Sequence, residues 1–224
     1  TTITFGLHSP DGDQGYPGNA DITVSYTLTP DNCLKLDYHM VSDADTIANF
    51  TNHVYFNLGG YKSGSALDQK VWIDADYFTA TDANSIPTGE LVAVKGTPMD
   101  FTEMKPIGRD IQEDYQALKY GNGYDHNWAL NHPAGELSLS AKAEDEKTGR
   151  TMEVYTDLPG VQFYTANSLK TEHGKNHAVY TPRCGYCFET QYFPDAINKP
   201  EFASPVIKAG EEYKTTTIYK FGVK

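Results

Sequence analysis

Strict alternation of apolar and polar residues is the feature that most constrains how this chain can fold. Residues 22–28 alternate apolar and hydroxyl side chains, residues 29–32 carry turn formers, and residues 34–40 alternate again. Residues 137–141 and 152–156 repeat this arrangement around a turn at 145–149. A period of two is typical of strands with one buried face. The pattern therefore predicts antiparallel hairpins and a mostly β fold.

One stretch has a helical period instead. Ile107, Ile111, Tyr115 and Leu118 recur at spacings of four, four and three, and Pro106 suits the first turn of a helix. We therefore expect one short helix near residues 106–119. No linker, repeat or low-complexity block divides the 224 residues, so we expect a single domain over 1–224.

Charge and cysteine content exclude several classes of protein. Eighteen basic and thirty acidic residues give a net charge of −12, which disfavours binding to nucleic acids and to anionic membranes. No apolar run reaches the roughly 18–20 residues of a membrane span. Three cysteines cannot form a disulfide framework, which favours a reducing, cytoplasmic setting. Cys184 and Cys187 have metal-ligand spacing but no second ligand pair, so we expect no metal site.

Three segments combine residues that carry chemistry. Residues 49–60 group amides, aromatics and His53, whereas residues 121–128 bring Asp125 together with a histidine and a tryptophan on a glycine-rich bend. In the third segment, Glu189 stands among aromatic residues. If Glu189 points inward, loss of solvation raises its pKa and suits it to exchange protons near neutral pH. Together these groups suit a neutral, polyhydroxylated ligand.

Nine short motifs occur in a fixed order along the chain, and each would be weak evidence alone. They lie at residues 9–12, 15–18, 51–58, 106–110, 123–126, 159–165, 187–191, 198–202 and 210–213. At these motifs the sequence resembles the aldose 1-epimerase family, also called galactose mutarotases, over essentially its whole length.

The resemblance implies a large antiparallel β-sandwich that interconverts the α and β anomers of a free hexose, galactose or glucose, without a cofactor. The partner is then a small-molecule sugar, and nothing indicates an oligomeric state. Glu189 matches the general base and His53 the general acid of the family. Asp125 and Gln162 match positions that hydrogen-bond sugar hydroxyls. Tyr55 and Val54 lie in the same sugar-binding stretch as His53.

The sequence also departs from the family pattern. Members of the family carry, before the part that Thr1 begins, an Asn-Arg pair and a second sugar-contacting histidine, and neither His8 nor His39 lies in a matching motif. We therefore expect an N-terminally incomplete epimerase that keeps the acid and the base. Two alternatives stay open, a carbohydrate-binding module without turnover and an epimerase of a hexose phosphate. The acidic balance disfavours the phosphate, which usually recruits Arg or Lys.

Overall fold

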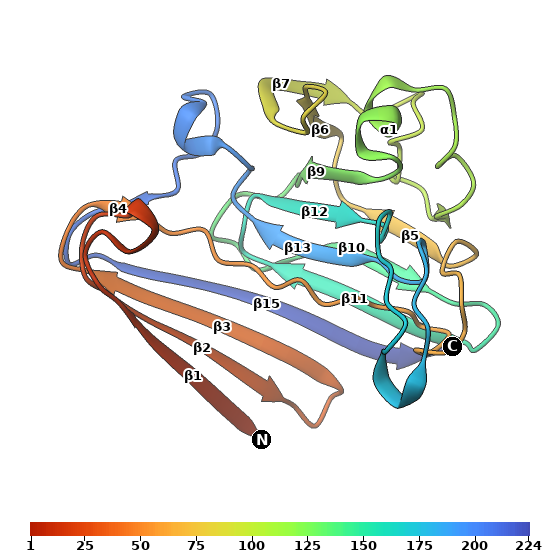
Figure 1. Cartoon of the computed structure of the whole chain (residues 1–224), viewed down its shortest axis with the longest axis horizontal. Coiled ribbons are helices and arrows are strands. Elements are labelled where there is room, and N and C mark those ends of the chain that lie inside the picture. Colours follow the sequence, from red (N-terminus) through yellow and green to blue (C-terminus); the bar gives the residue numbers. More distant parts are fainter.

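The protein, described over residues 1–224 by a computed structural model, consists mainly of antiparallel strands in two packed sheets (Figure 1). The larger sheet has eight strands, in the order β1 (Thr2–Ser9), β2 (Ala20–Leu28), β3 (Cys33–Ser42), β15 (Glu212–Val223), β11 (Arg150–Thr156), β10 (Ser138–Glu144), β5 (Lys70–Ile73) and β8 (Lys105–Pro106). The smaller sheet has five, in the order β13 (Cys187–Gln191), β12 (Gly160–Tyr164), β9 (Asp125–Ala129), β6 (Tyr77–Thr81) and β7 (Pro87–Ala93). A third, two-stranded sheet pairs β14 (Val206–Ile207) with β4 (Thr46–Ile47).

Both predicted hairpins are confirmed. Strands β2 and β3 pair antiparallel, with Val24 opposite Tyr38 and Tyr26 opposite Leu36. Strands β10 and β11 pair in the same way across the predicted turn. Residues opposite each other in a sheet share a face, so the alternation read from the sequence places the apolar side chains together. The fold is the predicted antiparallel β-sandwich.

The two large sheets bury one shared core between them. Trp128 and Phe163 of the smaller sheet are fully buried in it, together with Val154 of the larger sheet. The hydroxyl groups of Thr190 on β13 and Thr217 on β15 lie 2.5 Å apart and link the two layers. Alternate residues of β9, β12 and β13 thus face the core, which leaves the residues between them for the outer face of the smaller sheet.

The predicted helix exists, but most of its predicted extent is wrong. Helix α1 covers only Gln116–Gly121. Residues 107–115 form turns instead, because the amide of Ile107 donates to Gln69 and that of Gly108 to Leu67, at 2.9 and 2.8 Å. Gly108 permits this close approach, since a Cβ atom there would lie 3.2 Å from the Leu67 carbonyl oxygen. The helical spacing of the isoleucines reflects loop residues that insert into the core.

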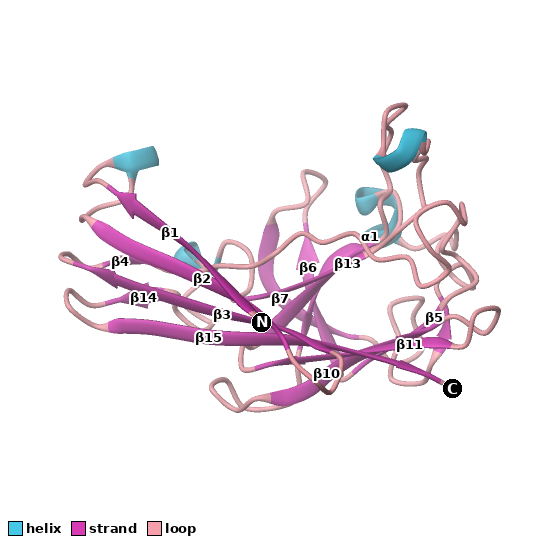
Figure 2. Ribbon diagram, turned by 90° about the horizontal axis from the view of Figure 1, so that it is seen from below, coloured by secondary structure: helices cyan, strands magenta, loops and turns pink.

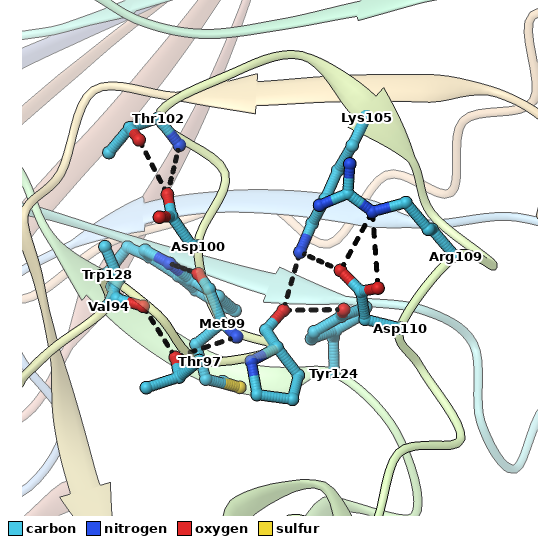
Figure 3. A network of polar contacts seen from close by, with 11 residues as sticks. Val94, Thr97, Met99, Asp100, Thr102, Lys105, Arg109, Asp110, Tyr124 and Trp128 are labelled. Carbon is cyan, nitrogen blue, oxygen red and sulfur yellow. Dashed lines mark hydrogen bonds and ion pairs between the residues drawn. The ribbon is translucent and has the colours of Figure 1, made fainter.

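A buried lysine explains how this loop is held (Figure 3). Lys105 is 1% exposed, and its Nζ donates to Asp110 Oδ2 and to the Pro98 carbonyl, each at 2.7 Å. Burial lowers the pKa of Lys105, while the Asp110 carboxylate opposes that shift. The Tyr124 hydroxyl donates to the same Pro98 carbonyl at 2.9 Å. The network therefore fixes Tyr124, and with it the first residue of β9, Asp125.

The outer strand β1 carries an apolar face that is open to solvent. Ile3, Phe5 and Leu7 point to one side of the strand and are 56%, 55% and 63% exposed. Figures 1 and 2 show β1 and β2 extending away from the smaller sheet. The partly buried residues opposite them on β2 pack against the core, so the exposed apolar residues of β1 lie next to the edge of the core. No helix in the structure has the length and apolarity needed to cross a membrane.

Candidate active site

The candidate site lies on the outer face of the smaller sheet, where three adjacent strands place polar residues in register. Gln162 on β12 is opposite Glu189 on β13 and Asn127 on β9. One row along, Tyr164 is opposite Asp125 and Cys187. The residues between them, such as Phe163, point into the core. The period of two that builds the core therefore also assembles the polar outer face.

His53 reaches this face from an irregular segment beside β13. Its neighbour Asn52 is buried and exchanges two hydrogen bonds with the hydroxyl of Tyr219, at 2.8 and 3.0 Å. Three residues after His53, the backbone of Phe56 pairs with that of Tyr186 in both directions, at 2.8 and 3.0 Å. The segment is thus anchored to the core on both sides of His53. A side chain on a loop is held in place in this way without being part of a strand.

Glu189 and His53 form the central pair. The Nε2 atom of His53 lies 3.4 Å from Oε1 of Glu189, and the two side chains are 51% and 12% exposed, respectively. Burial raises the pKa of Glu189 to about 7; the nearby Asp125 raises it further, while His53 acts in the opposite direction. The structure thus produces the tuned carboxyl group that the aromatic surroundings of Glu189 indicated.

Asp125 and Gln162 are joined beside this pair. Gln162 Nε2 donates to Asp125 Oδ1 at 2.8 Å. Burial raises the pKa of Asp125, although the hydrogen bond from Gln162 and the proximity of His53 both lower it. The remaining side-chain oxygen of Gln162 is buried and accepts no hydrogen bond from the protein. The hydrogen bond between the two side chains fixes the orientation of the polar groups that they present to the cleft.

Aromatic rings border the imidazole. The ring of His53 lies 5.0 Å from that of Tyr55 and 5.9 Å from that of Tyr164, measured between centroids. Burial raises the pKa of Tyr55 to about 12, so its hydroxyl keeps its proton at neutral pH. These groups surround an open cleft of about 420 Å³, which is lined by His53, Tyr55, Asp125, Gln162, Tyr164, Glu189, Gln191 and Pro194.

The cleft gathers five of the six residues expected from the sequence. Val54 is not among the lining residues, and the residue is 37% exposed. The histidine and tryptophan of residues 121–128 do not reach the cleft either. His126 alternates to the core face of β9, where it is 1% exposed and burial lowers its pKa to about 4. Of that segment, only Asp125 is among the residues that line the cleft.

The cleft also includes residues that sequence reasoning missed. Tyr164 follows Gln162 by two positions and Gln191 follows Glu189 by two, so both share a face with a predicted site residue. Strand alternation could have found them. Pro194 lies beyond β13 and carried no comparable signal.

One group of side chains resembles a metal-ligand set. Potential ligand atoms of His53, Cys187 and Glu189 lie within 4.8 Å of one another. However, Cys187 Sγ faces Nδ1 of His53, at 3.4 Å, whereas Glu189 faces Nε2. A single ion needs ligands that converge on it, and these two groups approach different ring nitrogens. The arrangement is that of a hydrogen-bonded chain. Cys184 lies outside this group, and all three cysteines are free thiols.

Comparison with known proteins relates this chain to a family. The family model described as aldose 1-epimerase matches residues 1–220. The chain is 42% identical to the human galactose mutarotase over 222 residues, which is 99% of this chain and 63% of that protein. It thus spans less than two thirds of the length of that relative.

Solved structures agree with the sequence comparisons. The galactose 1-epimerase of Lactobacillus acidophilus superposes with a TM-score of 0.85 at 30% identity, over 99% of this chain and 63% of that one. An aldose epimerase homologue from C. elegans gives a TM-score of 0.88 at 24% identity, over 99% of this chain and 66% of that one, and shows the same fold.

Proposed function

Because the chain belongs to the aldose 1-epimerase family, we propose that it interconverts the α and β anomers of a free aldohexose, galactose or glucose, by general acid and base catalysis. The observation that carries the proposal is the pair in the cleft. A carboxyl group with a pKa of about 7 faces an imidazole across 3.4 Å. A carboxyl group with this pKa gains and loses protons near neutral pH, as proton exchange in both directions requires.

The reaction has balanced steps. Glu189 accepts the proton of the C1 hydroxyl while His53 donates a proton to the ring oxygen, and the bond between C1 and the ring oxygen breaks. The open-chain aldehyde rotates about its C1–C2 bond. On closure, the hydroxyl that was the ring oxygen returns its proton to His53 and attacks the other face of C1, whose oxygen regains a proton from Glu189. Each group ends in its starting state, and no cofactor enters the steps.

The remaining cleft residues have orienting roles in this proposal. Asp125 and Gln162 hold sugar hydroxyls through the polar atoms that their mutual hydrogen bond leaves free. The rings of Tyr55 and Tyr164 offer apolar faces to the C–H side of a sugar. Orientation matters because a displacement of about 1 Å can cost on the order of a hundredfold in rate. Val54 has no sugar-binding role in this proposal, because it is not among the residues that line the cleft; it only connects His53 and Tyr55.

The charge of the cleft supports a neutral sugar over a phosphorylated one. Its lining residues include two carboxyl groups and neither Lys nor Arg. A phosphate group there would meet like charge and no bidentate donor. The three free thiols support a reducing, cytoplasmic setting for the protein.

Polarimetry of freshly dissolved α-galactose tests the function. We expect the protein to speed the change in optical rotation, and the Glu189→Gln variant to lose on the order of 10²–10⁴-fold of that rate. Glu136→Gln, on an exposed loop, is the matched control and should act like the unchanged protein. Equal rates for Glu189→Gln and the unchanged protein would show that Glu189 is not the base.

Calorimetry with galactose separates turnover from binding alone. If the protein binds galactose while rotation changes no faster than in buffer, the cleft is a carbohydrate-binding site without catalysis. Absence of binding, together with absence of catalysis, would remove both functions.

A further inference from the structure

The contact between Cys187 and His53 is not explained by the acid and base roles. Cys187 is fully buried at the start of β13, on the same face as Glu189. Its Sγ atom lies 3.4 Å from Nδ1 of His53, and no other protein group hydrogen-bonds to that nitrogen. The opposite ring nitrogen, Nε2, faces Glu189 at 3.4 Å. The imidazole is thus held between a thiol and a carboxyl group.

We propose that Cys187 is a positioning residue for His53, holding the ring so that Nδ1 keeps its proton while Nε2, on the cleft side, gives up and takes back the exchanged proton; this inference rests on the proposed function. His53 is half-exposed and stands on an irregular segment. Tyr55 and Tyr164 confine its ring sideways but offer no hydrogen bond to Nδ1. The thiol, fixed by the backbone ladder between β12 and β13, supplies that bond.

A thiol suits this place because its sulfur can accept a hydrogen bond without carrying a charge. In the proposed steps Nε2 of His53 gives up a proton and takes it back, so the neutral ring keeps its remaining proton on Nδ1, whose N–H group donates to the sulfur. When His53 is protonated, its Nδ1–H group donates to the same sulfur. A carboxylate in this place would accept the same hydrogen bond, but its charge would favour the protonated ring. The thiol therefore serves both states that a group alternating between acid and base must pass through.

The surroundings keep the thiol in its neutral form. Burial raises the pKa of Cys187, and the neighbouring carboxyl groups of Glu189 and Asp125 raise it further. The titratable groups that face the imidazole are these two acids, Cys187 and two tyrosines, with no lysine or arginine among the cleft residues. Nothing nearby therefore favours a thiolate. A neutral sulfur makes only a weak hydrogen bond and leaves His53 free to change its charge.

Three variants test the role. Cys187→Ala removes the hydrogen bond, Cys187→Ser keeps a group that donates and accepts, and Cys184→Ala is the control at a thiol outside the cluster. For Cys187→Ala we expect kcat for galactose to fall about tenfold with KM unchanged, and the limb of the kcat–pH profile that depends on His53 to move. Cys187→Ser should stay within about threefold of the unchanged protein. Equal losses in both variants with an unmoved pH profile would indicate a packing role and overturn the proposal.

Nitrogen-15 NMR of the His53 ring provides a readout that does not depend on catalysis. At a pH where His53 is neutral, we expect one tautomer in the unchanged protein, protonated at Nδ1, and a mixture in Cys187→Ala. The same single tautomer in Cys187→Ala would overturn the proposal even if catalysis were impaired. If the tautomer changes as expected but the unchanged protein does not speed mutarotation, the proposed function fails and the positioning role stands. One-to-one binding of Zn²⁺ that Cys187→Ala abolishes would instead identify a metal site and also overturn the proposal.

Discussion

Removing the charge of Glu189 should stabilise the folded protein while abolishing its proposed catalysis. Burial raises the pKa of this carboxyl group from an ordinary 4.5 to about 7 in the folded chain. The folded state therefore holds a proton that the unfolded chain has released between these two pH values. Stability consequently falls as pH rises through this window. At about 1.4 kcal/mol per pH unit, the ionised carboxylate costs about 3 kcal/mol at pH 8 and less than about 1 kcal/mol at pH 5.

Glu189→Gln keeps the shape of the side chain without the charge. We expect it to raise the free energy of unfolding by about 3 kcal/mol at pH 8, or Tm by about 6–12 °C for a chain of this size. The gain should nearly vanish at pH 5. Urea unfolding at both pH values measures it, with Glu136→Gln as the exposed control. A stability loss at pH 8, or an equal gain at both pH values, would refute the reasoning that burial disfavours the carboxylate.

Two further substitutions test the packing that supports the site. In Gly160→Ala the new Cβ atom would lie 2.4 Å from Asn127 Oδ1, so we expect urea unfolding to show a loss of about 1–3 kcal/mol in the free energy of unfolding. The control is Gly6→Ala, whose new Cβ atom would have no neighbour closer than 3.9 Å and which should change stability little. Equal losses in the two variants would contradict the packing argument. In Lys105→Met the Pro98 carbonyl and the partly buried Asp110 carboxylate lose the ammonium group between them, while Arg109 still pairs with Asp110, so we expect a loss of about 1–3 kcal/mol by thermal unfolding. Lys142→Met, whose side chain is 40% exposed, should stay within about 1 kcal/mol, and a comparable loss there would contradict the role of burial.

The strands were predictable because alternation reports directly on burial. The hairpin around residues 29–32 needs no information beyond its own sequence, since each apolar side chain takes the core face in turn. The start of the helix was not predictable in this way. Residues 107–108 satisfy their backbone amides on Gln69 and Leu67, and a local pattern contains no trace of such distant partners.

The residues of the site fall into the same two groups, those that a local sequence pattern predicts and those that depend on contacts with distant parts of the chain. Tyr164 and Gln191 follow from alternation once Gln162 and Glu189 are chosen. The contact of Cys187 with His53 joins residues 134 positions apart, and only the register of β13 against its neighbours brings them together. The raised pKa of Glu189 was predictable in direction from its aromatic flanks, whereas the opposing influences of Asp125 and His53 required the folded arrangement.

The central claim is that the fold buries one carboxyl group beside an imidazole so that it exchanges protons near neutral pH. Carbon-13 NMR of the Glu189 side-chain carboxyl, assigned by its loss in Glu189→Gln and followed from pH 3 to pH 9, measures this directly. We expect a titration midpoint near pH 7. A midpoint near the ordinary value of 4.5 would contradict the account, because a carboxylate that acidic is a weak base for a sugar hydroxyl.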